Sequence, residues 1–467
     1  MANSRRDFLR QTGCLLGGAA LASTFEGFGL MNAYAQESAV DDYKALVCVF
    51  LNGGNDGNNV VVDLGQYTQY SNVRAASTLA VPQSSLLAVS PLRGGSYGFH
   101  PNMPELRDLF AQGKLAVLCN AGPLVEPLTR TTYQNGTGKK PLQLFSHSDQ
   151  VNLWQTSIAN AVSQTGWGGR TADRTASLNG AATFPQVVSI AGLSTFVLGN
   201  NSRPLAISDS NTSLANVLPL NNAPGATTAE TNARRAAFDQ LRAFDTGAIL
   251  VKAASDTTSS ALQTRDSLLT APNTDFTKIP NTTLGRQLEQ VARLISLRGT
   301  LGVKRQIFFC SLGGFDTHTS QRQTAGQDGL LTQVSQALKG FYDTLVDLSL
   351  TLGSDVTREV TTFTLSDFGR TLQPSGSGTL VGSDHGWGNH QFVMGGAVRG
   401  GDFYGTYPTL ALGGPDDTDT RGRWIPTTSV EQYAATLATW YGLPTSDLAT
   451  VFPLIGRFPT PNLGFMS

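Results

Sequence analysis

Charged residues are scarce in this chain, and neither sign dominates. Of 467 residues, 33 are lysine or arginine and 34 are aspartate or glutamate, which is 14% charged and a formal net charge of −1. A chain without a basic excess lacks the electrostatic pattern of a protein that binds nucleic acid or an anionic membrane. We therefore expect no nucleic acid partner, and protein partners stay open.

Cysteine and long apolar runs are also rare. Three of the four cysteines, Cys48, Cys119 and Cys310, lie beyond the N-terminal leader, each within an apolar segment. An odd number in such surroundings argues against a disulfide framework and predicts buried thiols. After the leader, no apolar run approaches the roughly 20 residues that a membrane-spanning helix needs. The sequence therefore predicts no membrane span once the leader is removed.

The N-terminus has the pattern of an export signal. Arg5 and Arg6 precede a short apolar stretch rich in glycine and alanine, which is followed by an Ala-Tyr-Ala cleavage site ending at Ala35. This order resembles a twin-arginine signal, and the apolar stretch is too short for the alternative of an uncleaved anchor. We predict a signal peptide over residues 1–35, a mature domain over residues 36–467, and a location in the periplasm or at the surface of a bacterium.

Short runs of β-branched and apolar residues alternate with segments of helical periodicity. The predicted strands cover residues 45–51, 114–119, 186–190, 305–312 and 358–365. The predicted helices cover residues 104–112, 230–254, 284–297, 330–352 and about 429–441, the last with Thr428 and Glu431 as a capping box. This alternation predicts an α/β doubly wound fold, with a mostly parallel sheet flanked by helices. The segment from about 200 to 281 lacks strand signals, so we expect a mostly helical or loop insertion or cap there.

Acidic side chains follow three of the predicted strands. Asp56 lies in LNGGNDGNN, Asp316 in LGGFDTH and Asp367 in LSDFGRT, each directly after a strand. Because the carboxyl ends of parallel strands share one edge of a sheet, where ligands bind, we expect these carboxylates to converge. Singly, Asp56 also suits a turn and Asp316 a helix cap. Together they predict a metal or anion site.

Histidines supply the other candidate ligands. His318 lies two residues after Asp316, so both side chains project from the same face of an extended segment. Asp384 and His385 lie in GSDHGWGNH, which a Ser/Gly-rich stretch allows to fold back over the site, although Asp384 also suits a turn. Carboxylates and imidazoles without thiolates suit Zn, Mn or Fe, or Mg or Ca where imidazoles are few. We predict one or two divalent ions.

Two further segments carry candidate catalytic residues. LFSHSDQVNLWQT places Ser146 and His147 at the start of a predicted helix. A serine there is usually an N-cap, but the same position holds a hydroxyl nucleophile against oriented N–H groups that attract an anion. Arg170, in GWGGR, suits either an oxyanion contact or a pairing with a surface acid. Both alternatives stay open for Ser146 and for Arg170.

The ordered motifs resemble an exported bacterial family, the domain of unknown function 1501. The resemblance spans nearly the whole chain and is carried by the leader, VFLNGGNDGNN, SHSDQ, GWGGR, GGFDTH, LSDFGRT and DHGWGNHQFVMGGAVRGGDFYGTYP. That family is similar in turn to the alkaline phosphatase and sulfatase superfamily. The resemblance implies an alkaline-phosphatase-like fold and an exported, metal-dependent hydrolase of phosphate or sulfate esters, acting on a small-molecule or glycan ester.

The superfamily resemblance also implies roles for single residues. Its ordered metal ligands match Asp56, Asp316, His318, Asp367 and His385, and its nucleophile matches Ser146. Phe368 stands where the superfamily has a histidine directly after the aspartate that matches Asp367, so one nitrogen ligand is missing. Asp384 and His147 are the residues that would compensate. A one-metal site, or a non-catalytic binding or assembly protein that keeps the fold, is therefore the alternative.

Overall fold

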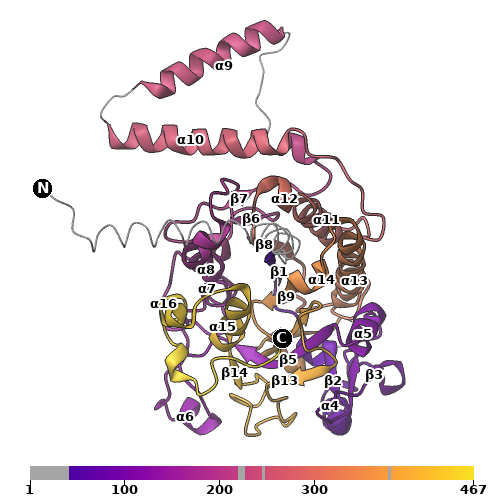
Figure 1. Cartoon of the computed structure of the whole chain (residues 1–467). Helices are drawn as coiled ribbons and strands as arrows, with labels where there is room; N and C mark the ends of the chain where they lie inside the picture. Colours follow the sequence, from indigo (N-terminus) through magenta and orange to yellow (C-terminus); the bar gives the residue numbers. More distant parts are fainter. Residues whose placement is uncertain (1–41, 219–226, 245–247, 377–379) are drawn as a thin grey trace, which may run out of the picture. The chain divides into compact units, whose positions relative to one another are not determined.

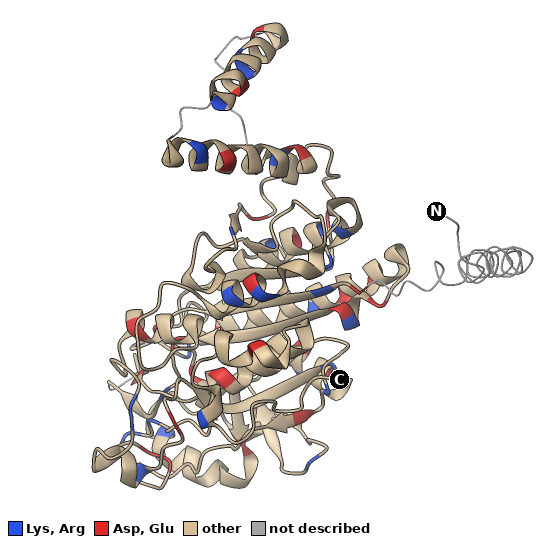
Figure 2. Ribbon diagram, turned by 60° about the vertical axis from the view of Figure 1, so that its left-hand side comes forward, with Lys and Arg blue, Asp and Glu red and all other residues tan. Residues whose placement is uncertain are grey.

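The computed structural model describes residues 42–218, 227–244, 248–376 and 380–467. The predicted export signal over residues 1–35 lies outside them. Among the described residues, no helix is both long and apolar enough to cross a membrane. Lysine and arginine are interspersed with aspartate and glutamate along the ribbon (Figure 2), in keeping with the small net charge. The unit described below begins at Tyr43.

A nine-stranded sheet forms the centre of this unit (Figure 1). Its strands are β1 Lys44–Leu51, β5 Leu115–Gly122, β6 Val187–Ser189, β7 Leu205–Ala206, β8 Arg305–Leu312, β9 Val360–Ser366, β12 Asn389–Met394, β13 Asp402–Tyr404 and β14 Thr428–Ser429. They lie in the order β13-β5-β12-β9-β1-β8-β6-β7, and β14 also pairs with β5. Every pair is parallel except those of β12 with β5 and β9. The predicted mostly parallel sheet is confirmed.

Helices cover both faces of the sheet, as a doubly wound fold requires. In β1, Val47 and its alternate neighbours face one apolar core, whereas Cys48 and its alternate neighbours face the other. Three of the helices that pack on the first core and three of those on the second lie on opposite sides of the sheet in Figure 1. They are α5 Pro104–Ala111, α11 Thr283–Ser296 and α13 Gln327–Leu352 on the first, and α7 His147–Thr156, α8 Trp167–Thr175 and α15 Val430–Tyr441 on the second. Because both faces are covered, the central strands are continuous apolar runs.

Smaller elements surround this framework. Two additional sheets pair β10 with β11 and join β2, β4 and β3. Their strands are β2 Val61–Asp63, β3 Leu87–Val89, β4 Tyr97–Phe99, β10 Arg370–Ser375 and β11 Gly382–His385. The remaining α-helices of the described chain are α3 Gly57–Val60, α4 Tyr67–Arg74, α6 Arg130–Gln134, α9 Thr228–Ala243, α10 Ile249–Leu268, α12 Arg298–Leu301, α14 Val356–Glu359 and α16 Leu448–Val451. The three cysteines are free and buried, as predicted.

The predicted cap of the last helix is wrong by one residue. Ser429, and not Thr428, is the N-cap of α15, and its hydroxyl accepts the N–H of Glu431. Gln432 supplies the reciprocal side chain of the capping box. Thr428 is unavailable because it belongs to β14 and pairs with Ala121 of β5. Tertiary strand pairing therefore decided which of two adjacent hydroxyl residues caps the helix.

The helix predicted over residues 230–254 is two helices, α9 and α10. The described part of α9 ends at Ala243, and Phe244 has an extended backbone. The sequence that follows is Asp-Thr-Gly, and glycine has the lowest helix propensity of any residue except proline. α10 then runs to Leu268, which packs into the core on the α11 and α13 face. The predicted strand at 358–365 likewise starts later, at Val360, because α14 takes up the preceding residues.

Glu431 is a buried carboxyl on α15. Only 2% of the residue is exposed, and its Oε1 accepts the N–H of Leu454 at 3.0 Å. Burial raises the pKa of Glu431 to about 8, although the hydrogen bond from Leu454 and the charge of Arg170 act to lower it. A carboxyl of this kind is neutral in the folded protein at pH values where it is ionised in the unfolded chain.

We expect this carboxyl to make the folded state less stable as the pH rises. Because the folded pKa is raised, the stabilisation is fully present below pH ~4 and is lost as the pH rises through about 8. Glu431→Gln should therefore exceed the wild type in stability at pH 9, by as much as about 5 kcal/mol, and differ much less at pH 5. Urea unfolding at both pH values measures this, and an equal difference at the two would contradict it.

Candidate metal centre

The candidate site lies at the edge of the sheet where the parallel strands end. Asp316 and His318 follow β8, and Asp367 follows β9. His385 ends β11, shortly before the antiparallel strand β12 begins at this same edge, and His147 opens α7. The segment GSDHGWGNH, predicted as a loop, is thus partly strand. The edge location agrees with the expectation that ligands bind beyond the carboxyl ends of parallel strands.

Three imidazole rings direct their Nε2 atoms at one carboxylate oxygen. The Nε2 atoms of His318, His147 and His385 lie 3.2, 3.5 and 3.8 Å from Asp316 Oδ1. The Nε2 atoms of His318 and His385 are 2.9 Å apart. We name these four residues the histidine cluster. The ligand atoms of His147, Asp316 and His385 lie close enough together to hold one metal ion. His318 joins these three through its contacts with Asp316 and His385. The contacts of 2.9 to 3.8 Å are similar to the separations between ligands of one zinc ion with bonds of ~2.0–2.2 Å.

Each ring of the histidine cluster is oriented by a hydrogen bond at its other nitrogen. The Nδ1 contacts are His147 to Asp367 Oδ2 (2.8 Å), His318 to Asp384 Oδ1 (3.1 Å) and His385 to Phe145 O (2.7 Å). All three partners are acceptors, so with a metal ion at the centre the proton of each ring would be on Nδ1. Each Nε2 then presents a lone pair to the centre, which is the arrangement of metal-bound histidines and their supporting carboxylates.

The environment sets the protonation that metal binding needs. Partial burial acts to raise the pKa of Asp316, but the hydrogen bond and charge of Arg370 outweigh it and hold the pKa below its usual value. Burial lowers the pKa of His385, against the effect of its bond to the Phe145 carbonyl. The hydrogen bond to Asp367 raises the pKa of His147. At neutral pH the cluster therefore offers an anionic oxygen and at least one uncharged imidazole.

Arg370 binds the loops of the site together. Its guanidinium donates to Asp316 Oδ1 at 2.5 Å and to the backbone oxygens of Gly53, Gly54, Phe315 and Ser383. Gly53 explains why LNGGNDGNN is rich in glycine. It has φ +117°, and a Cβ there would lie 2.3 Å from the backbone nitrogen of Asp316. The close approach of these two loops therefore requires glycine at position 53.

Asp367 and Phe368 support the cluster from behind. Asp367 is fully buried, and its two oxygens accept from Gly53 N–H (3.0 Å) and contact His147 Nδ1. The ring of Phe368 lies 4.8 Å from that of His147 and 4.6 Å from that of His385. The residue that replaces the expected histidine therefore packs against two imidazoles and does not point a donor atom at the centre. Asp384 also supports the cluster, because its Oδ1 contacts His318 Nδ1.

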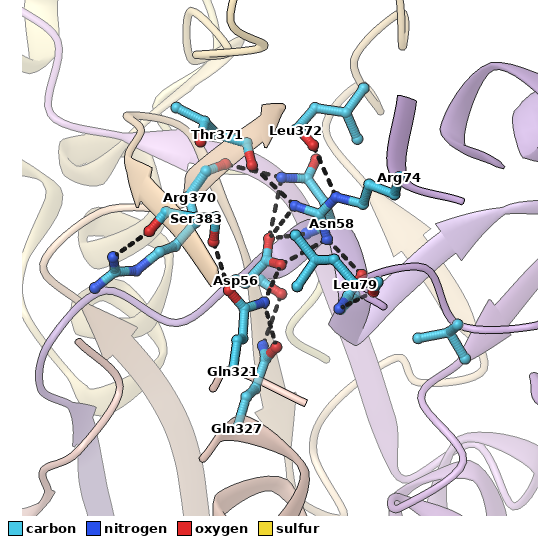
Figure 3. Close-up of polar contacts among 12 residues, drawn as sticks. Asp56, Asn58, Arg74, Leu79, Gln321, Gln327, Arg370, Thr371, Leu372 and Ser383 are labelled. Atoms are coloured by element: carbon cyan, nitrogen blue, oxygen red, sulfur yellow. Dashed lines mark hydrogen bonds and ion pairs between the residues drawn. The ribbon is translucent and has the colours of Figure 1, made fainter. Parts of the chain in front are cut away.

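The structure does not bring Asp56 to the histidine cluster. Its carboxylate is buried and is surrounded by donors, with Arg74 on one side and Gln321 on the other (Figure 3). Oδ2 accepts from Arg74 at 2.7 Å and from Gln321 at 2.6 Å, and Oδ1 accepts from Arg74 and from the backbone and side chain of Asn58. A guanidinium thus balances this carboxylate, so Asp56 is not among the possible metal ligands of the histidine cluster.

Of the three candidate catalytic residues, His147 belongs to the histidine cluster, and the other two differ in their surroundings. Ser146 is at the N-cap position of α7 without a capping hydrogen bond, and its hydroxyl lies 2.6 Å from Asp149 Oδ2. Because the next residue is His147, this hydroxyl is close to the cluster along the chain. Arg170 is buried, and its guanidinium donates to the backbone oxygens of Thr156, Thr165 and Val451. Arg170 therefore ties backbone segments together and makes no contact with the histidine cluster.

Sequence reasoning missed Arg370 and two arginines from one turn, which contact Asp384 and His385. Arg421 bonds to Asp384 Oδ2, and Arg423 donates from Nε to the backbone oxygen of His385 at 2.9 Å. Both come from the Arg-Gly-Arg of DTRGRW. Two arginines around a glycine, next to an acidic stretch, were a possible signal of an anion contact, but no predicted element placed them near the site.

The structure is similar to several solved structures of low sequence identity. A protein in the alkaline phosphatase superfamily from Vibrio parahaemolyticus is 12% identical, with a TM-score of 0.31 over 86% of this chain and 67% of that chain. The 2-O GAG sulfatase BT1596 is 9% identical, with a TM-score of 0.33 over 88% and 74%. Ps i-CgsB, in complex with k-i-k-neocarrahexaose, is 9% identical, with a TM-score of 0.34 over 90% and 77%. Such a likeness concerns the fold alone.

Sequence comparison assigns the family. None of the curated proteins matches the chain. The family model described as a protein of unknown function, DUF1501, matches residues 43–418. The matched range includes every residue of the histidine cluster, so it covers the site as well as the sheet. The resemblance read from the ordered motifs is confirmed, and the chain belongs to the DUF1501 family.

Proposed function

We propose that this protein is an exported, metal-dependent hydrolase of phosphate or sulfate esters. The observation that carries the proposal is the convergence of the Nε2 atoms of His147, His318 and His385 on Asp316 Oδ1. Three imidazoles and one carboxylate favour zinc over manganese, magnesium or calcium. When bound, one such ion would polarise an ester oxygen and offset the charge that develops on it. The substrate would be a small-molecule or glycan ester.

The charges around the site support an anionic substrate. Two of the three carboxylates near the centre already have a partner that balances their charge, Asp316 with Arg370 and Asp384 with Arg421. The third, Asp367, contacts Nδ1 of His147. A divalent cation would bring two positive charges to a site with one unbalanced carboxylate, which leaves the site with excess positive charge. An ester anion of phosphate or sulfate would offset that excess.

Ser146 is the nucleophile in this proposal. Its hydroxyl donates to Asp149 Oδ2 at 2.6 Å, so a carboxylate is in place to accept the proton as Oγ attacks. The hydroxyl lies at the N-terminus of α7, where unpaired N–H groups and the helix dipole favour an approaching anion. The chain therefore supplies the attacking oxygen, the base and part of the anion's binding energy.

Replacing Ser146 with alanine should remove turnover and leave the metal in place. We expect hydrolysis of an aryl phosphate or aryl sulfate to fall roughly a thousandfold or more, as when a catalytic nucleophile is lost. Zinc content should not change, and stability should fall by less than about 1 kcal/mol, because the hydroxyl makes no cap bond. Ser84→Ala, which removes an exposed hydroxyl shortly before β3, is the control. Wild-type turnover in Ser146→Ala would remove Ser146 from the chemistry.

A second candidate function is a non-catalytic binding or assembly protein with one structural ion. Phe368 in place of a histidine, and Asp56 paired with Arg74, favour it, because both reduce the number of metal ligands. The discriminating measurement is hydrolysis of aryl phosphate and aryl sulfate by the metal-loaded wild type across metals and pH values. A protein that keeps its metal and hydrolyses neither ester supports the binding protein and contradicts the hydrolase.

Export by the twin-arginine route is part of the proposal. Arg5 and Arg6 lie outside the described residues, and the sequence pattern alone supports this step. Changing both to lysine should abolish export, because the paired guanidinium groups are the distinguishing feature of such signals. Cell fractionation measures the loss. N-terminal sequencing of the exported wild type should start near Gln36, and a start at Met1 or Ala2 would contradict cleavage.

A further inference from the structure

A turn built around one buried carboxylate lies beside the histidine cluster. Asp417 is fully buried, and its Oδ2 accepts the N–H groups of Gly413 and Gly422, both at 2.9 Å. Its Oδ1 accepts those of Asp419 at 3.2 Å and Arg423 at 3.1 Å. Four backbone donors on one carboxylate hold this segment in a single conformation. The backbone positions of Arg421 and Arg423, which lie in this turn, are therefore well defined.

Arg421 extends from this turn to the His318 side of the cluster. One of its terminal nitrogens, Nη2, bonds to Asp384 Oδ2, while Asp384 Oδ1 contacts His318 Nδ1. The Arg421 side chain is 37% exposed. Within the described chain, its Nε and Nη1 have no side-chain or backbone partner. Arg421 thus combines a fixed contact at the site with N–H groups that face solvent.

Arg423 reaches the opposite side, next to Ser146. Its Nε donates to the backbone oxygen of His385, and its Nη1 donates to Asp419 Oδ2 at 3.3 Å. The guanidinium lies 4.3 Å over the ring of Phe145, the residue immediately before Ser146. Stacking on an aromatic ring orients a guanidinium plane without using its hydrogen-bond donors. Nη2 of Arg423 has no partner among the described residues.

We propose that Arg421 and Arg423 together bind the anionic head of the substrate. Arg421 bonds to Asp384, which in turn contacts His318 Nδ1, and Arg423 bonds to the backbone oxygen of His385. Each guanidinium also has N–H groups without a partner among the described residues. A tetrahedral oxyanion held at the centre has more oxygens than one ion can contact, and guanidinium groups match such oxygens in geometry and charge. This inference rests on the proposed function and assigns the residues that select an oxyanion ester as substrate.

Anion binding by the zinc-loaded protein tests this without any turnover. Isothermal titration calorimetry with inorganic phosphate, and separately with sulfate, compares the wild type with R421M, R421K and R423M. We expect R421M and R423M to weaken binding about tenfold or more, because each loses a charge-assisted hydrogen bond, and R421K to weaken it less. R399M, which changes an exposed arginine beyond the far end of β12, is the control and should bind as the wild type. Zinc is measured in every variant.

The possible outcomes separate this inference from the proposed function. Weaker anion binding in zinc-loaded R423M and R421K supports the arginine pair, whether or not the protein hydrolyses esters. Failure of the wild type to hydrolyse any ester would contradict the hydrolase but not the anion site. Unchanged anion affinity and unchanged KM for aryl esters in both variants overturn the pair and leave the hydrolase standing. A zinc-loaded wild type that binds neither anion also overturns it. Because Arg421 supports Asp384 as well, R421K and R423M decide the matter if R421M loses zinc.

Discussion

Asp316→Ala should remove the bound metal and ester hydrolysis together. Asp316 Oδ1 is the atom on which three histidine Nε2 atoms converge, at 3.2 to 3.8 Å. Removing it leaves three neutral imidazoles and takes away the only negative charge among the four ligands. Loss of a supporting residue alone costs 10- to 100-fold in metal affinity, so loss of the ligand itself should cost more than about 100-fold. Metal analysis after dialysis, together with aryl ester hydrolysis, measures both effects.

Asp384→Asn is the graded control for this prediction. Asp384 contacts His318 Nδ1 and Arg421 but no metal-facing atom, so its replacement should weaken zinc binding by about 10- to 100-fold and leave a loaded site at high zinc. Asp384→Asn should stay folded, because Asp384 lies at the exposed edge of the sheet. Asp316→Ala leaves the buried guanidinium of Arg370 without its carboxylate partner, so its zinc content is measured on the folded fraction. Stoichiometric zinc in dialysed Asp316→Ala would show that the histidine cluster is not a metal site.

Arg74→Met should destabilise the protein without affecting the metal. The Arg74 and Asp56 side chains are fully buried and 2.7 Å apart, so removal of the guanidinium leaves a buried carboxylate without its counter-charge. Breaking such a pair by removing one partner costs about 3–5 kcal/mol. Urea or guanidinium unfolding measures the loss. Zinc content of the folded fraction should equal that of the wild type, because neither residue contacts the histidine cluster.

A double variant separates the ion pair from packing effects. Asp56→Asn combined with Arg74→Met removes both charges, so it should recover part of the stability that Arg74→Met loses, and the recovered amount measures the cost of the unpaired carboxylate. A loss below about 1 kcal/mol in Arg74→Met would contradict a tightly paired network. Loss of zinc from folded Arg74→Met would show that Asp56 contributes to metal binding after all.

The sequence by itself determined the sheet and the edge at which the site lies. β1, β8 and β9 were predictable because strands covered on both faces are continuous apolar runs, and such runs stand out in a chain with few charges. Parallel strands then place Asp316, His318 and Asp367 at one edge, whatever the details of the packing. Local pattern was sufficient there because each inference needed only residues adjacent in the chain.

Tertiary structure alone decided which polar residue has which role. Asp56 and Asp316 both follow apolar strands, yet Asp56 is paired with Arg74 of α4, whereas Asp316 faces three imidazoles. Asp367 contacts Nδ1 of His147, a residue at the start of α7 that is distant from Asp367 in the sequence. A carboxylate binds metal or supports a ligand according to the donors that surround it. Those donors come from segments distant in sequence, so their identity depends on packing that no local pattern records.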